Sequence, residues 1–199
     1  MKTLFKLIFS LFTALVVGVY WCHYGPQNFL WLSDMGLFLT LSALWLESPL
    51  LISIASAGIM PLEILWIFDF VTHIFTGSSP VGLTGYMFDP NLPLYLRSIS
   101  LFHLILVPTW ITLLAQWGYD SRGWKYATIL CTLIFIATYN LEHPFENINL
   151  IFTPSFDNLT WISPREWFIG QVIILPLFVF WPMHKILGWC FTSPARVKL

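Results

Sequence analysis

Seven polar or ionisable side chains of this chain lie inside apolar segments, and several are of the types that act as acids, bases or nucleophiles. They are Ser33, Asp34, Asp69, His73, His103, Asn140 and Gln171. Burying such groups in hydrocarbon is costly unless they pair, contact water or take part in a reaction. A topology derived from the distribution of Lys and Arg puts all seven in the same half of the bilayer. We therefore expect a polar site at that depth.

Ser33 and His103 are the most plausible nucleophile and base in the chain. A hydroxyl nucleophile needs a base within hydrogen-bond distance. Each of the two residues is expected about 8 Å below the outer start of its helix, at 1.5 Å of rise per residue. Their matched depth predicts that His103 accepts the proton of Ser33. Asp69 is expected to orient the imidazole as the acid of a Ser-His-Asp arrangement, with Asp34 as the alternative acid.

Other readings of the same residues stay open. Asp69 and His73 are four residues apart and share one helical face, so a purely structural contact between them is an alternative. Asp69, His73 and His103 are also a possible ligand set for a metal-dependent hydrolase. However, the sequence has no HExxH or HxxxH motif, and we expect no cofactor. In a third reading the protein is not an enzyme, and its polar residues only set the register of packed helices.

Two loops are expected to cover the mouth of the site. They are Tyr24–Asn28 before the second apolar segment and Glu142–Asn149 after the fifth. Their amides and carboxylates are suited to a polar head group, although they also suit tight turns. The residues expected to bind substrate are Tyr24, Asn28, His73, Asn140, Asn147, Asn149 and Gln171.

The composition predicts one integral membrane domain over residues 1–199. Hydrophobic residues make up 57% of the chain and charged residues 10%, and the mean hydropathy is +0.75. These values are typical of polytopic membrane proteins. The net charge of -1 provides no basic surface for nucleic acid, so membrane lipids are the expected partners. Cys22, Cys131 and Cys190 form no CxxC pair and are expected to be unpaired.

The apolar segments predict an all-α bundle of six transmembrane helices. A crossing helix needs about 20 apolar residues. Ser48-Pro49 and Ser163-Pro164-Arg165-Glu166 are typical helix starts, with an N-cap followed by proline. The third segment contains Pro61 and is either one kinked span or two half-helices. The predicted spans are 4–21, 28–46, 49–75, 98–117, 124–141 and 164–189.

The positive charges predict the orientation of the bundle. With the N-terminus inside, seven Lys and Arg fall on the cytoplasmic side and two on the outer side. Both termini are therefore expected in the cytoplasm, and a bacterial inner membrane is the expected location. The cytoplasmic residues would be Lys2, Lys6, Arg122, Lys125, Lys185, Arg196 and Lys198, and the outer ones Arg97 and Arg165.

Three short motifs resemble those of small bacterial integral membrane proteins of unassigned function. They are Asn28-Phe-Leu-Trp-Leu-Ser-Asp34, Ser100-Leu-Phe-His103 and Asn147-Ile-Asn-Leu-Ile-Phe152. Their order is similar to that in the YwaF-like family and in its eukaryotic transmembrane acyltransferase relatives. The resemblance implies that Ser33 stands where those proteins have a cysteine nucleophile and that His103 matches their histidine. Trp31 and Phe102 depart from the family pattern, where a histidine and a serine stand.

Taken together, the sequence predicts a lipid-directed acyltransferase or hydrolase with an outward-facing pocket inside the membrane. Ser33 would attack the acyl group and His103 would accept its proton. An apolar pocket entered from the bilayer suits acyl chains.

Overall fold

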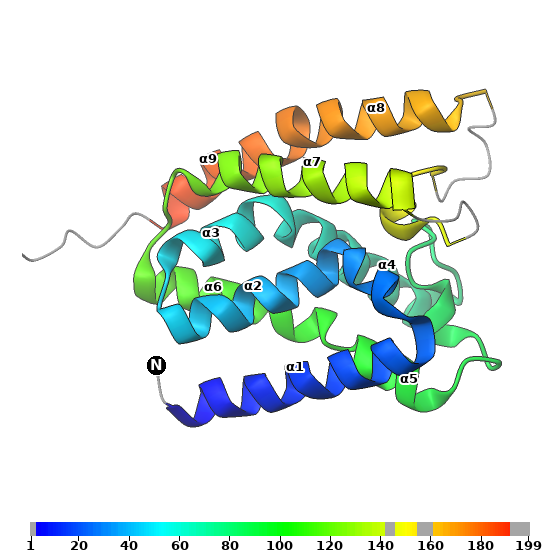
Figure 1. Cartoon of the computed structure of the whole chain (residues 1–199), viewed down its shortest axis with the longest axis horizontal. Coiled ribbons are helices and arrows are strands. Elements are labelled where there is room, and N and C mark those ends of the chain that lie inside the picture. Colours follow the sequence, from blue (N-terminus) through cyan, green and yellow to red (C-terminus); the bar gives the residue numbers. More distant parts are fainter. Residues whose placement is uncertain (1–2, 142–145, 155–160, 192–199) are drawn as a thin grey trace, which may run out of the picture.

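The computed structural model describes residues 3–141, 146–154 and 161–191, and every regular element in these ranges is a helix (Figure 1). In chain order they are α1 (Thr3–Tyr24), η1 (Pro26–Leu30), α2 (Leu32–Leu46), α3 (Pro49–Gly58), α4 (Met60–Thr76), η2 (Gly85–Phe88), α5 (Leu94–Ser100), α6 (His103–Trp117), α7 (Gly123–Leu141), η3 (Ile148–Leu150), α8 (Pro164–Ile174), η4 (Leu175–Phe180) and α9 (Trp181–Cys190). The prediction of an all-helical chain is confirmed for the described residues.

Several helices have the length and apolar character needed to cross a membrane. Three helical stretches meet both requirements, and the bent pair of α3 and α4 is a fourth if it counts as one span. Helices occupy all six ranges predicted from the sequence, but α2 is shorter than a typical span and α7 is not among the helices that meet both requirements. The three stretches are Thr3–Tyr24, Leu94–Trp117 and Pro164–Cys190. The chain therefore has the make-up of a membrane protein.

Two predicted helix starts are wrong, and both errors move a candidate catalytic residue. Residues 26–30 form the short 3-10 helix η1 after Gly25, whose φ is 85°, so α2 begins only at Leu32. The fourth segment breaks after α5, and α6 begins at His103. Ser33 therefore lies in the first turn of α2, and His103 is the first residue of α6 after a two-residue interruption of the stretch Leu94–Trp117.

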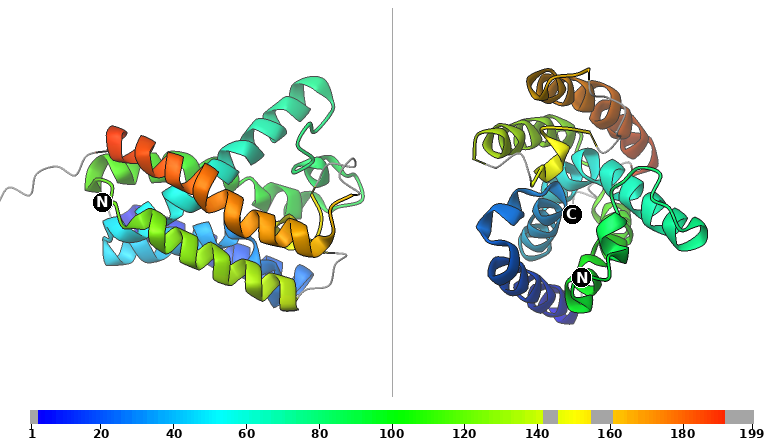
Figure 2. Two further views of the ribbon diagram at one scale, coloured as in Figure 1. Left: turned by 90° about the horizontal axis from the view of Figure 1, so that it is seen from above. Right: turned by 90° about the vertical axis from the view of Figure 1, so that its right-hand side faces the viewer.

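The third segment is bent rather than straight. α3 and α4 meet at Ile59 with an angle of 51°. Pro61 lies in the first turn of α4. Its ring has no N–H to donate and clashes with the carbonyl four residues earlier, which explains a break at this point. The bend turns α4 away from the rest of the bundle (Figure 2).

α3 is the central helix of the bundle and contacts α2, α6 and α7. Small residues allow these close approaches. A Cβ on Gly58 would lie 2.8 Å from the Cβ of Ala127, and a Cβ on Gly123 would lie 2.6 Å from that of Ser53. Close packing of small residues is a common way for helices to associate in membranes.

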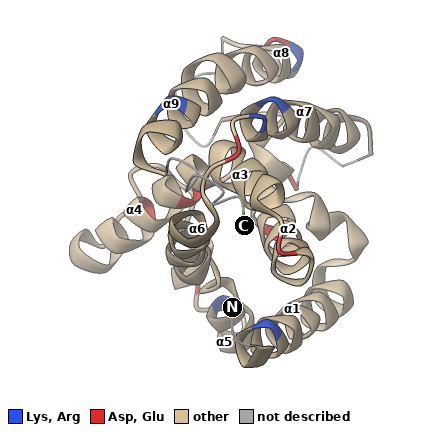
Figure 3. Cartoon of the chain, turned by 90° about the vertical axis from the view of Figure 1, so that its left-hand side faces the viewer, with Lys and Arg blue, Asp and Glu red and all other residues tan. Residues whose placement is uncertain are grey.

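α1 lies at the edge of the bundle and is held at both ends (Figures 1 and 2). Lys6 Nζ lies 2.6 Å from Glu47 Oε1, just after α2. At the other end the Tyr20 hydroxyl lies 2.8 Å from that of Ser100 on α5. The two outermost described residues, Thr3 and Phe191, lie at the same end of the bundle, and charged side chains are sparse along the helices (Figures 1 and 3).

The predicted helix starts at Ser48 and Ser163 are confirmed. The Ser48 hydroxyl accepts a hydrogen bond from the N–H of Leu51. Ser163 and Glu166 form the expected capping box at the start of α8. All three cysteines are free, as expected, and Cys131 is buried.

Candidate functional site

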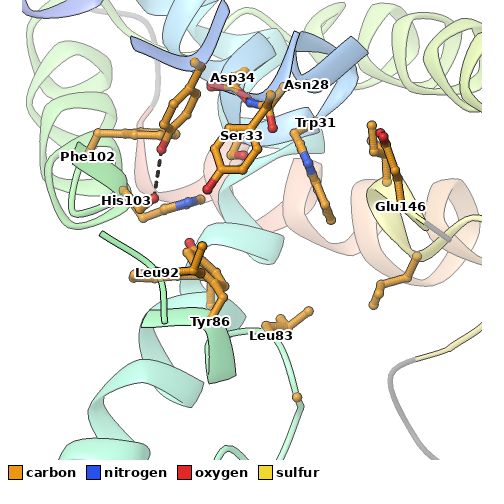
Figure 4. Close-up of a pocket in the computed structure, with 17 residues that line it drawn as sticks. Asn28, Trp31, Ser33, Asp34, Leu83, Tyr86, Leu92, Phe102, His103 and Glu146 are labelled. Atoms are coloured by element: carbon orange, nitrogen blue, oxygen red, sulfur yellow. Dashed lines mark hydrogen bonds between the residues drawn. The ribbon is translucent and has the colours of Figure 1, made fainter. Parts of the chain in front are cut away.

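A cavity of about 500 Å³ lies at one end of the bundle, away from the described chain ends (Figure 4). Residues from α1, α2, α4, α5 and α6 and from the intervening loops form its walls. The lining residues include Tyr20, Tyr24, Asn28, Trp31, Ser33, Asp34, Trp66, Leu83, Tyr86, Ser100, Phe102, His103 and Glu146. The structure thus brings Ser33, Asp34 and His103 to the same cavity, together with the predicted binding residues Tyr24 and Asn28.

His103 is held in a fixed orientation in the cavity wall. Its Nδ1 lies 2.6 Å from Glu63 Oε2, and only 2% of the Glu63 surface is exposed. The imidazole ring stacks on Trp66 at 4.2 Å and on Phe102 at 4.4 Å between ring centroids. The acid that orients His103 is therefore Glu63. This corrects the expectation that Asp69 or Asp34 has that position.

Ser33 is half-buried in the first turn of α2 and lines the cavity. Among the described residues there is no hydrogen bond between Ser33 and His103. A substrate in the cavity would lie between the two side chains, and catalytic hydrogen bonds are often long before substrate binds. Figure 4 shows His103 and Ser33 on neighbouring walls of the cavity.

Asp34 is a buried carboxylate on the same wall, with 2% of its surface exposed. Its Oδ2 accepts a hydrogen bond of 3.1 Å from Asn28 Nδ2. Its Oδ1 has no hydrogen-bond partner in the described part of the chain. The carboxylate lies at the N-terminus of α2, where the helix dipole favours negative charge.

Tyrosine hydroxyls add hydrogen-bonding groups to the cavity. Tyr20 contacts Ser100 through its hydroxyl, and Tyr24 packs edge-on against the Tyr20 ring. Tyr86 comes from the loop between α4 and α5. Burial raises the pKa of Tyr86 above its ordinary value. Its phenol therefore stays neutral at ordinary pH and retains its hydrogen as a donor.

Asp69 has a different position from the one predicted. It is fully buried, and its carboxylate accepts hydrogen bonds from the N–H groups of Val81, Leu83 and Thr84 at 2.7, 2.8 and 2.9 Å. The Thr84 hydroxyl donates a fourth bond of 2.8 Å. Asp69 thus anchors the loop after α4, and Leu83 in that loop lines the cavity. It shapes the cavity wall and makes no hydrogen bond with His73 or His103.

His73 also contacts the loop after α4. Its Nδ1 lies 2.7 Å from the Ser79 hydroxyl, and its ring stacks on Phe88 at 3.7 Å between centroids. It is not among the residues lining the cavity. Within residues 3–141, 146–154 and 161–191, no three His, Cys, Asp or Glu side chains come together to hold a metal ion. The proposed ligand set of Asp69, His73 and His103 does not form, because each side chain is engaged elsewhere.

The remaining predicted binding residues lie outside the cavity. Asn140 is exposed on α7 and donates to the carbonyl of Ile136 in its own helix. Gln171 donates to the Leu150 carbonyl. Asn147 folds its own loop by accepting from the N–H groups of Phe152 and Thr153.

Asn149 links its loop to the start of α2. Its Oδ1 accepts from the N–H of Leu32 at 2.9 Å, and its Nδ2 donates to the carbonyl of Leu30 at 2.7 Å. Asn149 thus positions the turn that presents Ser33. The preceding residues 142–145 of the predicted covering loop lie outside the described ranges.

Sequence reasoning missed Glu63 and Trp66 as site residues. A usable signal exists, because Met60, Glu63, Trp66 and Asp69 recur every three residues and form the buried face of α4. Two acids at this spacing in an apolar segment distinguish this face of α4 from the others. Tyr20, Ser100 and Tyr86 had no comparable signal.

Comparison with known proteins adds no family to this picture, since no family model, curated protein or solved structure matches the chain.

Proposed function

We propose that this protein is a membrane-embedded serine acyltransferase or hydrolase that acts on a lipid or a lipid-linked acyl group. The main support is the Glu63–His103 pair, at 2.6 Å, in the wall of a cavity that Ser33 also lines. A buried carboxylate on Nδ1 leaves Nε2 of the same ring as the acceptor for a hydroxyl proton. This is the arrangement that activates a serine nucleophile.

The reaction proceeds through an acyl-serine intermediate. Ser33 Oγ forms a bond to the acyl carbon while its proton moves to His103 Nε2, and Glu63 stabilises the imidazolium. The ester bond to the leaving alcohol then breaks, and the alcohol takes the proton from His103. In the next half-reaction water or a second alcohol bonds to the acyl carbon and gives its proton to His103; the acyl–Oγ bond then breaks, and His103 returns the proton to Ser33 Oγ.

The start of α2 supplies a way to stabilise the negative charge that develops on the acyl oxygen. First-turn N–H groups of a helix have no acceptor within the helix. Those of Ser33 and Asp34 belong to this turn. Backbone N–H groups aimed at a developing oxyanion are a major source of rate enhancement in acyl transfer.

The lipid substrate and the membrane orientation are parts of the same proposal. Three membrane-length apolar helices support a location in a bilayer, where lipid acyl groups are the abundant acyl donors. We place the protein in a bacterial inner membrane with six spans, both termini in the cytoplasm and the cavity facing outward. The resemblance of the motif order to that of the YwaF-like family is a further reason to propose Ser33 and His103 as the reacting pair.

The test is labelling of the purified full-length protein with a fluorophosphonate probe, which reacts with activated serines. We expect labelling of the wild type and loss of labelling in Ser33→Ala and His103→Ala. Glu63→Gln keeps the size of the side chain but removes its charge, and should slow labelling at least about tenfold. Ser98→Ala and His23→Ala are matched controls, because both residues are exposed and outside the cavity.

Unlabelled wild-type protein that melts cooperatively would overturn the serine mechanism and favour a non-catalytic protein with a structural polar cluster. Labelling that persists in Ser33→Ala would place the reactive serine elsewhere. Labelling that is lost in Ser33→Ala but unchanged in Glu63→Gln would remove Glu63 from the mechanism while leaving the nucleophile.

A further inference from the structure

We infer that the cavity binds an organic ammonium group through Asp34, so that the substrate is an amine-bearing lipid. The statement that the bound lipid is the substrate rests on the proposed function. The binding of the ammonium group can be measured without any reaction. It starts from the Asp34 carboxylate, which is almost fully buried yet uses only one of its two oxygens.

The charges around the cavity favour a cation. Among the lining residues there are two carboxylates, those of Asp34 and Glu146, and neither Lys nor Arg is present. The His103 imidazole is already paired with Glu63. A buried ionised carboxylate needs an opposite charge or several hydrogen-bond donors, and Asn28 supplies one donor. The ligand is therefore expected to bring the positive charge.

Aromatic side chains supply the rest of an ammonium site. Tyr20, Tyr24, Trp31, Trp66 and Tyr86 all contribute to the cavity wall. The negative faces of aromatic rings attract cations, most strongly when water is excluded. Aromatic rings alone would also suit a sugar, but a neutral sugar would supply no charge to stabilise the ionised form of Asp34.

The unpaired oxygen of Asp34 indicates which kind of ammonium group, primary or quaternary, fits the site better. Asp34 Oδ1 lacks a hydrogen-bond donor in the described residues. A primary ammonium has three N–H donors, whereas a quaternary ammonium has none. The geometry thus favours an ethanolamine-type group over a choline-type group. Asp34 follows Ser33 directly, so a bound ammonium lies close to the nucleophile.

The experiment measures lipid binding to the full-length protein in nanodiscs made from phosphatidylglycerol, which contains no amine. The probes are lauroyl lysophospholipids with ethanolamine, choline or glycerol head groups, and free ethanolamine. Binding is followed by the shift in melting temperature and by tryptophan fluorescence. We expect the ethanolamine lipid to bind at least tenfold more tightly than the glycerol lipid, with the choline lipid in between.

The variants test the role of the carboxylate. Asp34→Asn should reduce the preference for the ethanolamine lipid to less than about twofold, and Glu146→Gln, at the exposed mouth, should weaken it a few-fold. Asp120→Asn is the matched control, since Asp120 pairs with Arg122 outside the cavity and its loss should leave the preference unchanged. If Asp34→Asn fails to fold, the wild-type head-group comparison and Glu146→Gln decide the question.

Equal binding of the three lipids, or an unchanged preference in folded Asp34→Asn, would overturn the inference. Binding of free ethanolamine that competes with the lipid would identify a soluble amine as a ligand of the same site, whereas binding of the lipid alone would identify the head group. Ammonium binding by a protein that fluorophosphonate does not label would uphold the inference and reject the serine mechanism.

Discussion

At the scale of single residues, Glu63 and Asp69 look alike in the sequence but have different roles in the structure. Glu63 and Asp69 lie on the same buried face of α4. Glu63 reaches His103, whereas Asp69 is fully used by the backbone of the loop that follows α4. A carboxylate with four donors has no capacity left to orient a histidine. The two acids should therefore differ in what their removal damages.

Replacing Asp69 with alanine should mainly reduce stability. The change leaves the N–H groups of half-buried Leu83 and buried Thr84 without their acceptor, each at a cost of up to about 1–3 kcal/mol. We expect a loss of at least about 2 kcal/mol in the free energy of unfolding, measured by chemical denaturation in detergent. Asp89→Ala is the control, because Asp89 only caps a turn at Asn91. Equal stability of the two variants would contradict this role of Asp69.

At the scale of elements, short connections place the reacting groups. η1 and Asn149 set the start of α2, and the turn after α5 sets the start of α6. Ser33 consequently lies in the first turn of α2, whereas His103 follows the turn after α5, where the N–H groups of Leu104, Ile105 and Leu106 already donate to Leu101 and Phe102. The precision of the site thus depends on loop contacts as much as on helix packing.

Asn149→Ala should impair the site more than the fold. The change removes the two hydrogen bonds that tie the η3 loop to residues 30 and 32, worth about 1–2 kcal/mol together. Because these bonds position Ser33, we expect the rate of fluorophosphonate labelling to fall at least about tenfold. Asn140→Ala serves as the control, since its amide bonds only to its own helix. A full labelling rate in Asn149→Ala would show that η1 keeps its position unaided.

The contact between α3 and α7 should be intolerant of a single added methyl group. A Cβ at Gly123 would lie 2.7 Å from the backbone carbonyl carbon of Ser53, which has no room to move away. We expect Gly123→Ala to destabilise the protein by about 1–3 kcal/mol. A Cβ at Gly188 on α9 would have no neighbour within 4 Å, so Gly188→Ala should be neutral or slightly stabilising. Melting temperatures of the two variants in one detergent test this, and equal values would count against close packing at Gly123.

At the scale of the whole molecule, the described chain ends lie at one end of the bundle and the cavity lies at the other. This is the arrangement expected if the chain crosses the membrane an even number of times. The proposed orientation then puts the cavity on the outer side and the end of α9 in the cytoplasm.

The native cysteines test this orientation directly. Cys22 lies near the cavity end of α1, Cys190 ends α9 at the opposite end, and both are exposed whereas Cys131 is buried. We expect a membrane-impermeant maleimide to label Cys22 in intact cells and Cys190 only after permeabilisation. Cys22→Ser and Cys190→Ser assign each signal to its residue. Labelling of Cys190 in intact cells, with Cys22 protected, would invert the topology.

Local sequence patterns were enough to predict the helical class, the ranges of the apolar segments and the caps at Ser48 and Ser163. These features depend on local composition and on the first turn of a helix, which neighbouring residues decide. Ser33, Asp34 and His103 were also found in this way, because a polar group in an apolar segment stands out without any knowledge of contacts.

Tertiary contacts, by contrast, determine which acid pairs with His103 and where the helices that hold Ser33 and His103 begin. The 51° bend at Ile59 and the loop over Asp69 determine which side of α4 faces α6, and neither leaves a trace in hydrophobic periodicity. Asn149 acts on Leu32 across 117 positions of sequence. Contacts between residues so far apart in the sequence depend on how the helices pack. A local sequence pattern therefore does not predict them.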